Sequence, residues 1–191
     1  MESSNYTLYI KNMVCDRCIM VVRQQLTHLG YEFLSVELGT VSFSQPLTQQ
    51  DIKTLKDSIE PLGFEVIDDK RFQLIEQVKN LIVKLVHYKN NDLKVNLSQY
   101  IASQLHQDYS YISNLFSELE GTTIEQYFIA QKIEKVKELL DYDELSLSEI
   151  ADTLNYSSVA HLSTQFKKVT KLTPSQFKQR KQEKRKPLDK I

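Results

Sequence analysis

The sequence predicts an α+β protein of two domains, a small domain of strands and helices followed by an all-helical domain. Two observations lead to this prediction. Apolar residues in residues 1–70 alternate in short runs between stretches of helical spacing, whereas residues 71–191 show helical spacing throughout. With 191 residues, the chain is long enough for each domain to bury its own core.

The N-terminal segment has the predicted element order βαββαβ, which is the order of the ferredoxin-like plait. Thr48 and Asp51 have the spacing of a capping box at the start of the second helix, and Gly63 ends that helix. Strands are expected at residues 6–10, 33–38, 41–43 and 64–67, and helices at residues 19–29 and 52–62.

Two cysteines, Cys15 and Cys18, lie in the loop before the first helix. The dipole and free amides of a helix N-terminus lower the pKa of a thiol, so we expect thiolates that can bind soft metals. The spacing alone fits a redox pair, half of a zinc site, a Cu(I) site or two small core residues. The Trp-Cys-Gly-Pro-Cys context of thioredoxin-like proteins is missing, which argues against redox work.

Residues 5–68 resemble the heavy-metal-associated domain of copper chaperones and metal-transporting ATPases. The resemblance rests on Met-Val-Cys-Asp-Arg-Cys at residues 13–18 and on Glu-Pro-Leu-Gly-Phe at residues 60–64. It implies metal ligation by Cys15 and Cys18. Two thiolates suffice for nearly linear Cu(I), whereas Zn²⁺ needs further ligands, so Cu(I) is the favoured ion. A scaffold or dimer contact is the alternative role for this domain.

The segment from residue 146 to residue 177 predicts a helix-turn-helix, with helices at residues 148–154 and 158–169. Asn155 tolerates the left-handed conformation at the turn. In the second helix, Leu162, Phe166 and Val169 are expected to be buried because they share one face. Short or polar side chains and lysines flank this face and suit a DNA groove, namely Ser158, Ala160, His161, Thr164, Gln165, Lys167 and Lys168.

This helix-turn-helix resembles the second one of the AraC/XylS family of transcription regulators. The resemblance implies a regulator that binds double-stranded DNA, with RNA polymerase as a candidate second partner. Asn155 stands where the family has Gly, and residues 159–161 replace longer polar side chains. The matching positions are Ile150, Ala151, Tyr156, Ser158, Phe166, Lys167, Lys168 and Pro174.

A first helix-turn-helix is predicted at residues 97–105 and 109–119, with Ser110, Ser113 and Asn114 facing outward. It has no Lys or Arg, so we expect it to bind DNA more weakly than the second. Thr122 or Thr123 then caps a long helix that resembles the family's linking helix, in which Lys132 stands where Arg is usual. A three-residue junction, residues 68–70, predicts stiff coupling between the two domains.

Charge is distributed unevenly along the chain. Residues 1–70 have a net charge of −4, residues 71–156 of −5 and residues 157–191 of +8. Positive charge is thus concentrated where counterion release would favour duplex binding. Two cysteines are too few for a disulfide framework, and the absence of any signal or membrane-spanning stretch predicts a cytoplasmic protein.

The sequence therefore predicts a sequence-specific DNA-binding regulator with domains at 1–70 and 71–191, responsive to a soft metal ion. No phosphate loop, carboxylate pair or Ser/His/Asp arrangement indicates an enzyme. The alternative is a metal chaperone or thiol-redox module whose helical half docks a protein partner. The operator, the direction of regulation and the oligomeric state are not readable from the sequence.

Overall fold

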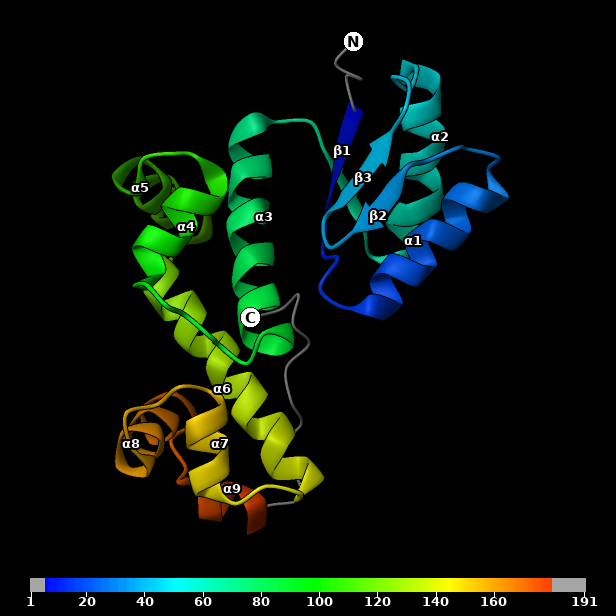
Figure 1. Cartoon of the computed structure of the whole chain (residues 1–191). Helices are drawn as coiled ribbons and strands as arrows, with labels where there is room; N and C mark the ends of the chain where they lie inside the picture. The colour runs from blue at the N-terminus through cyan, green and yellow to red at the C-terminus, as the bar shows by residue number, and fades with distance from the viewer. Residues whose placement is uncertain (1–5, 180–191) are drawn as a thin grey trace. The chain divides into compact units, whose positions relative to one another are not determined.

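A computed structural model of the chain describes residues 6–179 (Figure 1). It contains two compact units, Met1–Asn80 and Leu81–Ile191. The division falls within helix α3 (Lys70–Val83), whereas the sequence placed it after residue 70, where this helix begins. The apolar stripe of α3 continues through Ile75, Val78 and Ile82, so the sequence pattern gives no sign of a division inside the helix.

The first unit has the predicted βαββαβ order of elements. Its four strands form one antiparallel sheet in the order β2-β3-β1-β4. The strand predicted at residues 33–38 is shorter in the structure, where β2 covers residues 35–37 and the Leu34 amide before it donates to the carbonyl oxygen of Ser42 in β3 at 2.8 Å. The elements are β1 (Tyr6–Lys11), α1 (Asp16–His28), β2 (Ser35–Glu37), β3 (Thr40–Phe43), α2 (Gln49–Ile59), the 3₁₀ turn η1 (Glu60–Leu62) and β4 (Glu65–Ile67).

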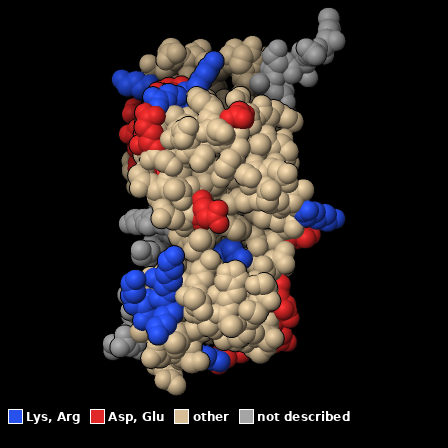
Figure 2. All heavy atoms as spheres, turned by 90° about the vertical axis from the view of Figure 1, so that its left-hand side faces the viewer, with Lys and Arg blue, Asp and Glu red and all other residues tan. Residues whose placement is uncertain are grey.

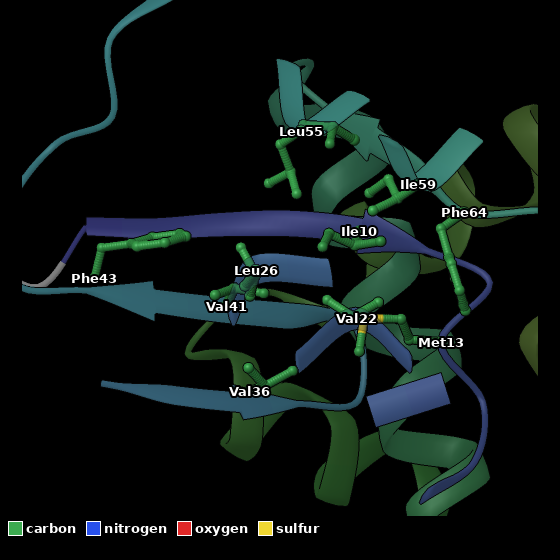
Figure 3. Close-up of a cluster of buried hydrophobic side chains, with 11 residues drawn as sticks. Ile10, Met13, Val22, Leu26, Val36, Val41, Phe43, Leu55, Ile59 and Phe64 are labelled. Carbon is green, nitrogen blue, oxygen red and sulfur yellow. The ribbon is translucent and has the colours of Figure 1, made fainter. Parts of the chain in front are cut away.

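The core of this unit lies between the sheet and its two helices (Figure 3). Ile10 and Val41 point from the sheet toward Val22 of α1 and Leu55 of α2, and all four are fully buried. The alternating pattern of β1 therefore correctly predicts that Ile10 is buried. Tyr6, at the outer end of the strand, is instead 43% exposed.

Helix ends in the first unit follow the signals predicted from the sequence. The Asp51 amide donates to Thr48 Oγ1 at 3.1 Å and the Thr48 amide donates to Asp51 Oδ2 at 3.0 Å, so the capping box is confirmed. Hydrogen bonds from Thr48 lower the pKa of Asp51. Gly63 adopts φ +89°, a left-handed conformation that glycine reaches without a Cβ penalty, where the η1 turn ends.

The second unit is helical, as predicted. Helix α6 packs against α5 and η2 and also against α7, α8 and α9 (Figure 1). No helix among the described residues is long and apolar enough to span a bilayer. After α3, the elements are a π-helical turn η2 (Lys84–Tyr88), α4 (Leu97–Leu105), α5 (Tyr109–Glu120), α6 (Ile124–Tyr142), α7 (Leu147–Thr153), α8 (Val159–Thr170) and α9 (Pro174–Gln179).

Two details of the second helix-turn-helix correct the sequence prediction. Helix α7 begins at Leu147 rather than at residue 148, because Ser146 and Glu149 form a capping box. Val169 is 44% exposed, although it was predicted to be buried. Val169 lies one turn beyond Phe166 and two turns beyond Leu162, near the end of α8, where the core no longer covers that face.

These burial differences predict different costs of truncation within one helix. Leu162→Ala should lower the free energy of unfolding by about 2 to 5 kcal/mol because it leaves a cavity in a fully buried site. Val169→Ala is the matched control and should change it by less than about 1 kcal/mol. Urea denaturation of the full chain followed by circular dichroism measures both values. Equal losses would contradict the packing described for α8.

Candidate nucleic-acid interface and thiol pair

The turn between α7 and α8 is fixed by backbone geometry. Asn155 adopts φ +58°, as predicted for the residue that replaces glycine here. The amide of Tyr156 then donates to the carbonyl oxygen of Ala151 at 2.8 Å. Ala151 is fully buried where the two helices meet. The second helix-turn-helix therefore has the geometry that the sequence predicted.

Helix α8 begins at a hydroxyl cap. Ser158 Oγ accepts the amide of His161 at 3.1 Å and so caps the helix, while its O–H remains available as a donor. Ser157, which the sequence analysis did not select, lies 3.0 Å from His161 Nδ1 through its own Oγ. The i, i+4 spacing of Ser157 and His161 was the available signal. His161 is consequently held by its neighbour while its side chain remains exposed.

The outward face of α8 carries most of the predicted contact residues. Gln165 is only half-buried and already has a protein partner, described below. The others are exposed, namely Ser158, Ala160, His161, Thr164, Lys167 and Lys168.

Gln165 is held by Tyr156, a residue of the turn that only the family resemblance singles out in the sequence. The hydroxyl of Tyr156 donates to Gln165 Oε1 at 2.7 Å. The ring of Tyr156 also packs edge-on against His161, with centroids 5.4 Å apart. Tyr156 is 7% exposed. A single buried side chain therefore contacts two residues of the recognition helix.

The ring of Tyr156 lies beneath a buried lysine from α6. Lys132 Nζ is 3.7 Å from the Tyr156 ring centroid and 5.6 Å from that of Phe128, an arrangement that favours cation–π attraction. Burial lowers the pKa of Lys132 from 10.5 to about 8. Burial also raises the pKa of Tyr156, so its hydroxyl stays protonated and can donate.

Positive charge gathers at the C-terminal end of α8. Lys167 and Lys168 lie in its last turn and Lys171 is its C-cap, with φ +65°. Figure 2 shows the side of the molecule that carries α5 and α8, with Lys and Arg side chains grouped in its lower part. Much of the predicted charge of the C-terminal segment falls on residues 180–191, which lie outside the described residues.

The first helix-turn-helix presents a different surface. Ser110 and Asn114 are exposed on α5 and Ser113 is half-buried, so the three predicted residues lie on its outward side. Tyr111 is also exposed on this helix, although the sequence analysis did not select it. Asp108 caps α5 by accepting the amide of Tyr111 at 3.0 Å. The helix itself contains no Lys or Arg.

The loop before α4 is attached to the turn of the second helix-turn-helix. Asn91 Nδ2 donates to the carbonyl oxygen of Leu154 at 2.9 Å, and Asn155 Nδ2 donates weakly to the carbonyl oxygen of Asn91 at 3.5 Å. Asn91 is 5% exposed and has φ +57°. Its Oδ1 is the one buried side-chain polar atom within residues 6–179 that has no hydrogen-bond partner.

In the first unit, the structure brings the two cysteines together. Cys15 Sγ lies 3.3 Å from Cys18 Sγ, and both side chains are half-buried at the start of α1. Burial raises the pKa of Cys18, and this effect outweighs the lowering by backbone hydrogen bonds. The expectation of a lowered pKa is therefore wrong for Cys18, because desolvation opposes the helix N-terminus.

The donor set at this loop consists of two sulfurs. Met13 is buried in the core and is not a third ligand. No cluster of three or more His, Cys, Asp or Glu side chains suited to a metal occurs among residues 6–179. Cys18 Sγ also lies 3.7 Å from the carbonyl oxygen of Asn12, whereas Cys15 makes no side-chain capping hydrogen bond. These two residues would hold a metal that accepts two soft ligands.

Comparison with known proteins finds proteins similar to the helical part of the chain. Residues 101–180 match the family model of the helix-turn-helix domain. The uncharacterized HTH-type transcriptional regulator YtdP of Bacillus subtilis (strain 168) is 26% identical over 163 residues, which are 82% of this chain and 21% of that protein. The Msm operon regulatory protein of Streptococcus mutans serotype c is 27% identical over 100 residues, which are 52% of this chain and 35% of that protein.

Solved structures give a match of the same kind. The C-terminal domain of the two-component response regulator yesN from Fusobacterium nucleatum subsp. nucleatum is 27% identical, with a TM-score of 0.46, and the match covers 53% of this chain and 98% of that chain. Residues 101–180 therefore match a helix-turn-helix domain and are similar to domains of the AraC type. These relatives are transcriptional regulators and not enzymes. The chain spans about a fifth of YtdP and about a third of the Msm regulator.

Burial of Lys132 predicts a specific dependence of stability on pH. Between pH 8 and 10.5 the unfolded chain binds more protons at this lysine than the folded protein does. The contribution of Lys132 to the free energy of unfolding should therefore rise with pH over this range. Lys132→Met should remove that rise, so the stability difference between wild type and variant should shift by up to about 1.4 kcal/mol per pH unit. Urea denaturation at pH 7, 8, 9 and 10 measures it, and parallel stability curves would contradict it.

Proposed function

We propose that this chain acts as a sequence-specific DNA-binding transcription regulator. The single observation that supports this most is the pairing of two helix-turn-helix motifs on one linking helix, with lysines at the end of the second recognition helix. Helix α6 has 19 residues and so spans about 28 Å. Recognition helices that enter successive major grooves lie ~34 Å apart, a distance of the same order.

The proposed contacts with DNA are of two kinds, contacts with phosphates and contacts with base edges. Lys167 and Lys168 are exposed ammonium groups that suit phosphates, which give affinity without sequence preference. His161 and Thr164 lie on the outward face of α8 and suit base edges. Because most of the other outward side chains are short, few bidentate contacts are available. DNA shape then contributes to sequence preference.

Substitution of one lysine and one threonine tests this division. Lys168→Ala should weaken binding to all duplexes alike and reduce the dependence of affinity on salt by about one phosphate contact. Thr164→Ala should instead relax preference at one or two positions. Fluorescence anisotropy with several duplexes at increasing salt measures both effects. A selective change of sequence preference in Lys168→Ala would refute the assignment.

For the N-terminal unit, we propose a ferredoxin-like plait of the heavy-metal-associated type that holds one Cu(I) ion on Cys15 and Cys18. The antiparallel strand order β2-β3-β1-β4 with two covering helices supports the fold. The two adjacent thiols at the start of α1, with no third donor beside them among residues 6–179, support a metal that accepts two soft ligands. When bound, the ion supplies a charge change at this loop that could alter DNA affinity by about 5- to 150-fold.

Replacement of both cysteines tests the metal proposal. Cys15→Ser with Cys18→Ser should abolish binding of one Cu(I) per chain, measured by competition with a chromogenic Cu(I) chelator. DNA affinity of this variant should remain at its metal-free value at every copper concentration. A double variant that still responds to copper would place the ligands elsewhere. Wild type that binds copper with unchanged DNA affinity would favour a chaperone or a scaffold role for this unit.

A further inference from the structure

We propose that Tyr156 determines part of the DNA sequence preference without touching DNA, by fixing the side-chain amide of Gln165. This inference rests on the proposed function. In wild type, the amide of Gln165 presents its N–H donors to the base edge, and the base preferred there carries acceptors and no donor on its major-groove edge, as guanine does with N7 and O6 and thymine with O4. Tyr156 is thus a positioning residue.

The first step concerns what the hydroxyl does to the amide. Gln165 offers one carbonyl acceptor and two N–H donors. Tyr156 donates to its Oε1 at 2.7 Å, so the oxygen is directed toward the turn and the nitrogen lies on the opposite side of the amide. A free glutamine pairs bidentately with adenine, using its oxygen and its nitrogen together. That pairing requires the oxygen and the nitrogen to face the base together, whereas Tyr156 directs the oxygen toward the turn.

The second step concerns why the Tyr156 hydroxyl is held in one position. The Tyr156 ring belongs to the core formed by α6, α7, α8 and α9. Lys132 lies over this ring at 3.7 Å and the backbone amide of Tyr156 is bonded to Ala151 at 2.8 Å. The hydroxyl therefore has little freedom to follow Gln165 if that side chain moves. Gln165, which is half-buried, adapts to the tyrosine instead.

The third step concerns the neighbouring recognition residue. His161 contacts the same ring edge-on and is held by Ser157 through Nδ1 at 3.0 Å. Removing only the hydroxyl of Tyr156 leaves the ring, and hence this contact, in place. Tyr156→Phe thus isolates the hydrogen bond to Gln165 from the packing of His161. A purely structural hydroxyl would affect stability but not the preferred base.

The experiment compares base preference among full-chain variants by selecting bound fragments from a pool of random duplexes. Gln165→Ala first identifies the position at which Gln165 acts, as the position where preference is lost. Tyr156→Phe should raise adenine at that same position by about five-fold or more relative to wild type, with other positions unchanged. In the Gln165→Ala background, Tyr156→Phe should have no effect on preference. Tyr142→Phe, at a tyrosine that is 62% exposed near the end of α6, is the control and should leave every position unchanged.

Each other outcome has a defined meaning. An unchanged base preference in Tyr156→Phe overturns the inference, as does a Tyr156→Phe effect that persists when Gln165 is alanine. A Gln165→Ala variant that loses preference nowhere also overturns it, because Gln165 then contacts no base. Wild type that enriches no sequence overturns the proposed function itself. A selective wild type with an unresponsive Tyr156→Phe overturns the inference alone.

Discussion

Burial of helix α6 is the constraint on which the second unit depends. Ile133 and Val136 lie in the core that α6 shares with α7, α8 and α9, whereas Tyr127 packs edge-on against Phe116 of α5 at 5.7 Å. Neither helix-turn-helix has a core large enough to be stable without this shared helix, because a short pair of helices buries little apolar surface. The same helix that stabilises both motifs therefore also sets the distance between their recognition helices.

The shared helix also carries polar groups in its buried face. Gln131 is fully buried and satisfied, since its Nε2 donates to the Tyr127 hydroxyl at 3.0 Å and its Oε1 lies 2.9 Å from His87 Nε2. Lys132, one residue further, packs its charge against aromatic rings. Buried polar groups with defined partners tolerate few alternative packings, whereas apolar contacts tolerate many. Gln131 and Lys132 thus specify one rotation of α6 about its axis relative to η2 and the α7–α8 turn.

Local signals account for what the sequence predicted. The capping boxes at Thr48 and Thr123, the left-handed Asn155 and the cap at Ser158 each depend on residues within a few positions. Features that join distant residues were not predictable, because spacing says nothing about which side chains meet. The Tyr156–Gln165 bond, the Lys132 stack and the contact of Asn91 with Leu154 belong to this group. The predicted burial of Val169 and the predicted lowering of the Cys18 pKa were wrong for a related reason. Both depend on how deeply a side chain is buried, and burial depends on the complete fold.

The contact between Asn91 and Leu154 has a consequence for how the second unit folds. It joins residues 63 positions apart and encloses the whole first helix-turn-helix and the linking helix between its ends. Closing a flexible loop of that length costs about 4 kcal/mol of chain entropy. A single hydrogen bond of about 1 kcal/mol cannot offset that cost, so the contact forms only after both motifs have packed against α6. Because the contact needs both motifs packed on α6 and each motif needs that helix, the two motifs should unfold together in one transition, and a half-folded intermediate with a single intact motif should not accumulate.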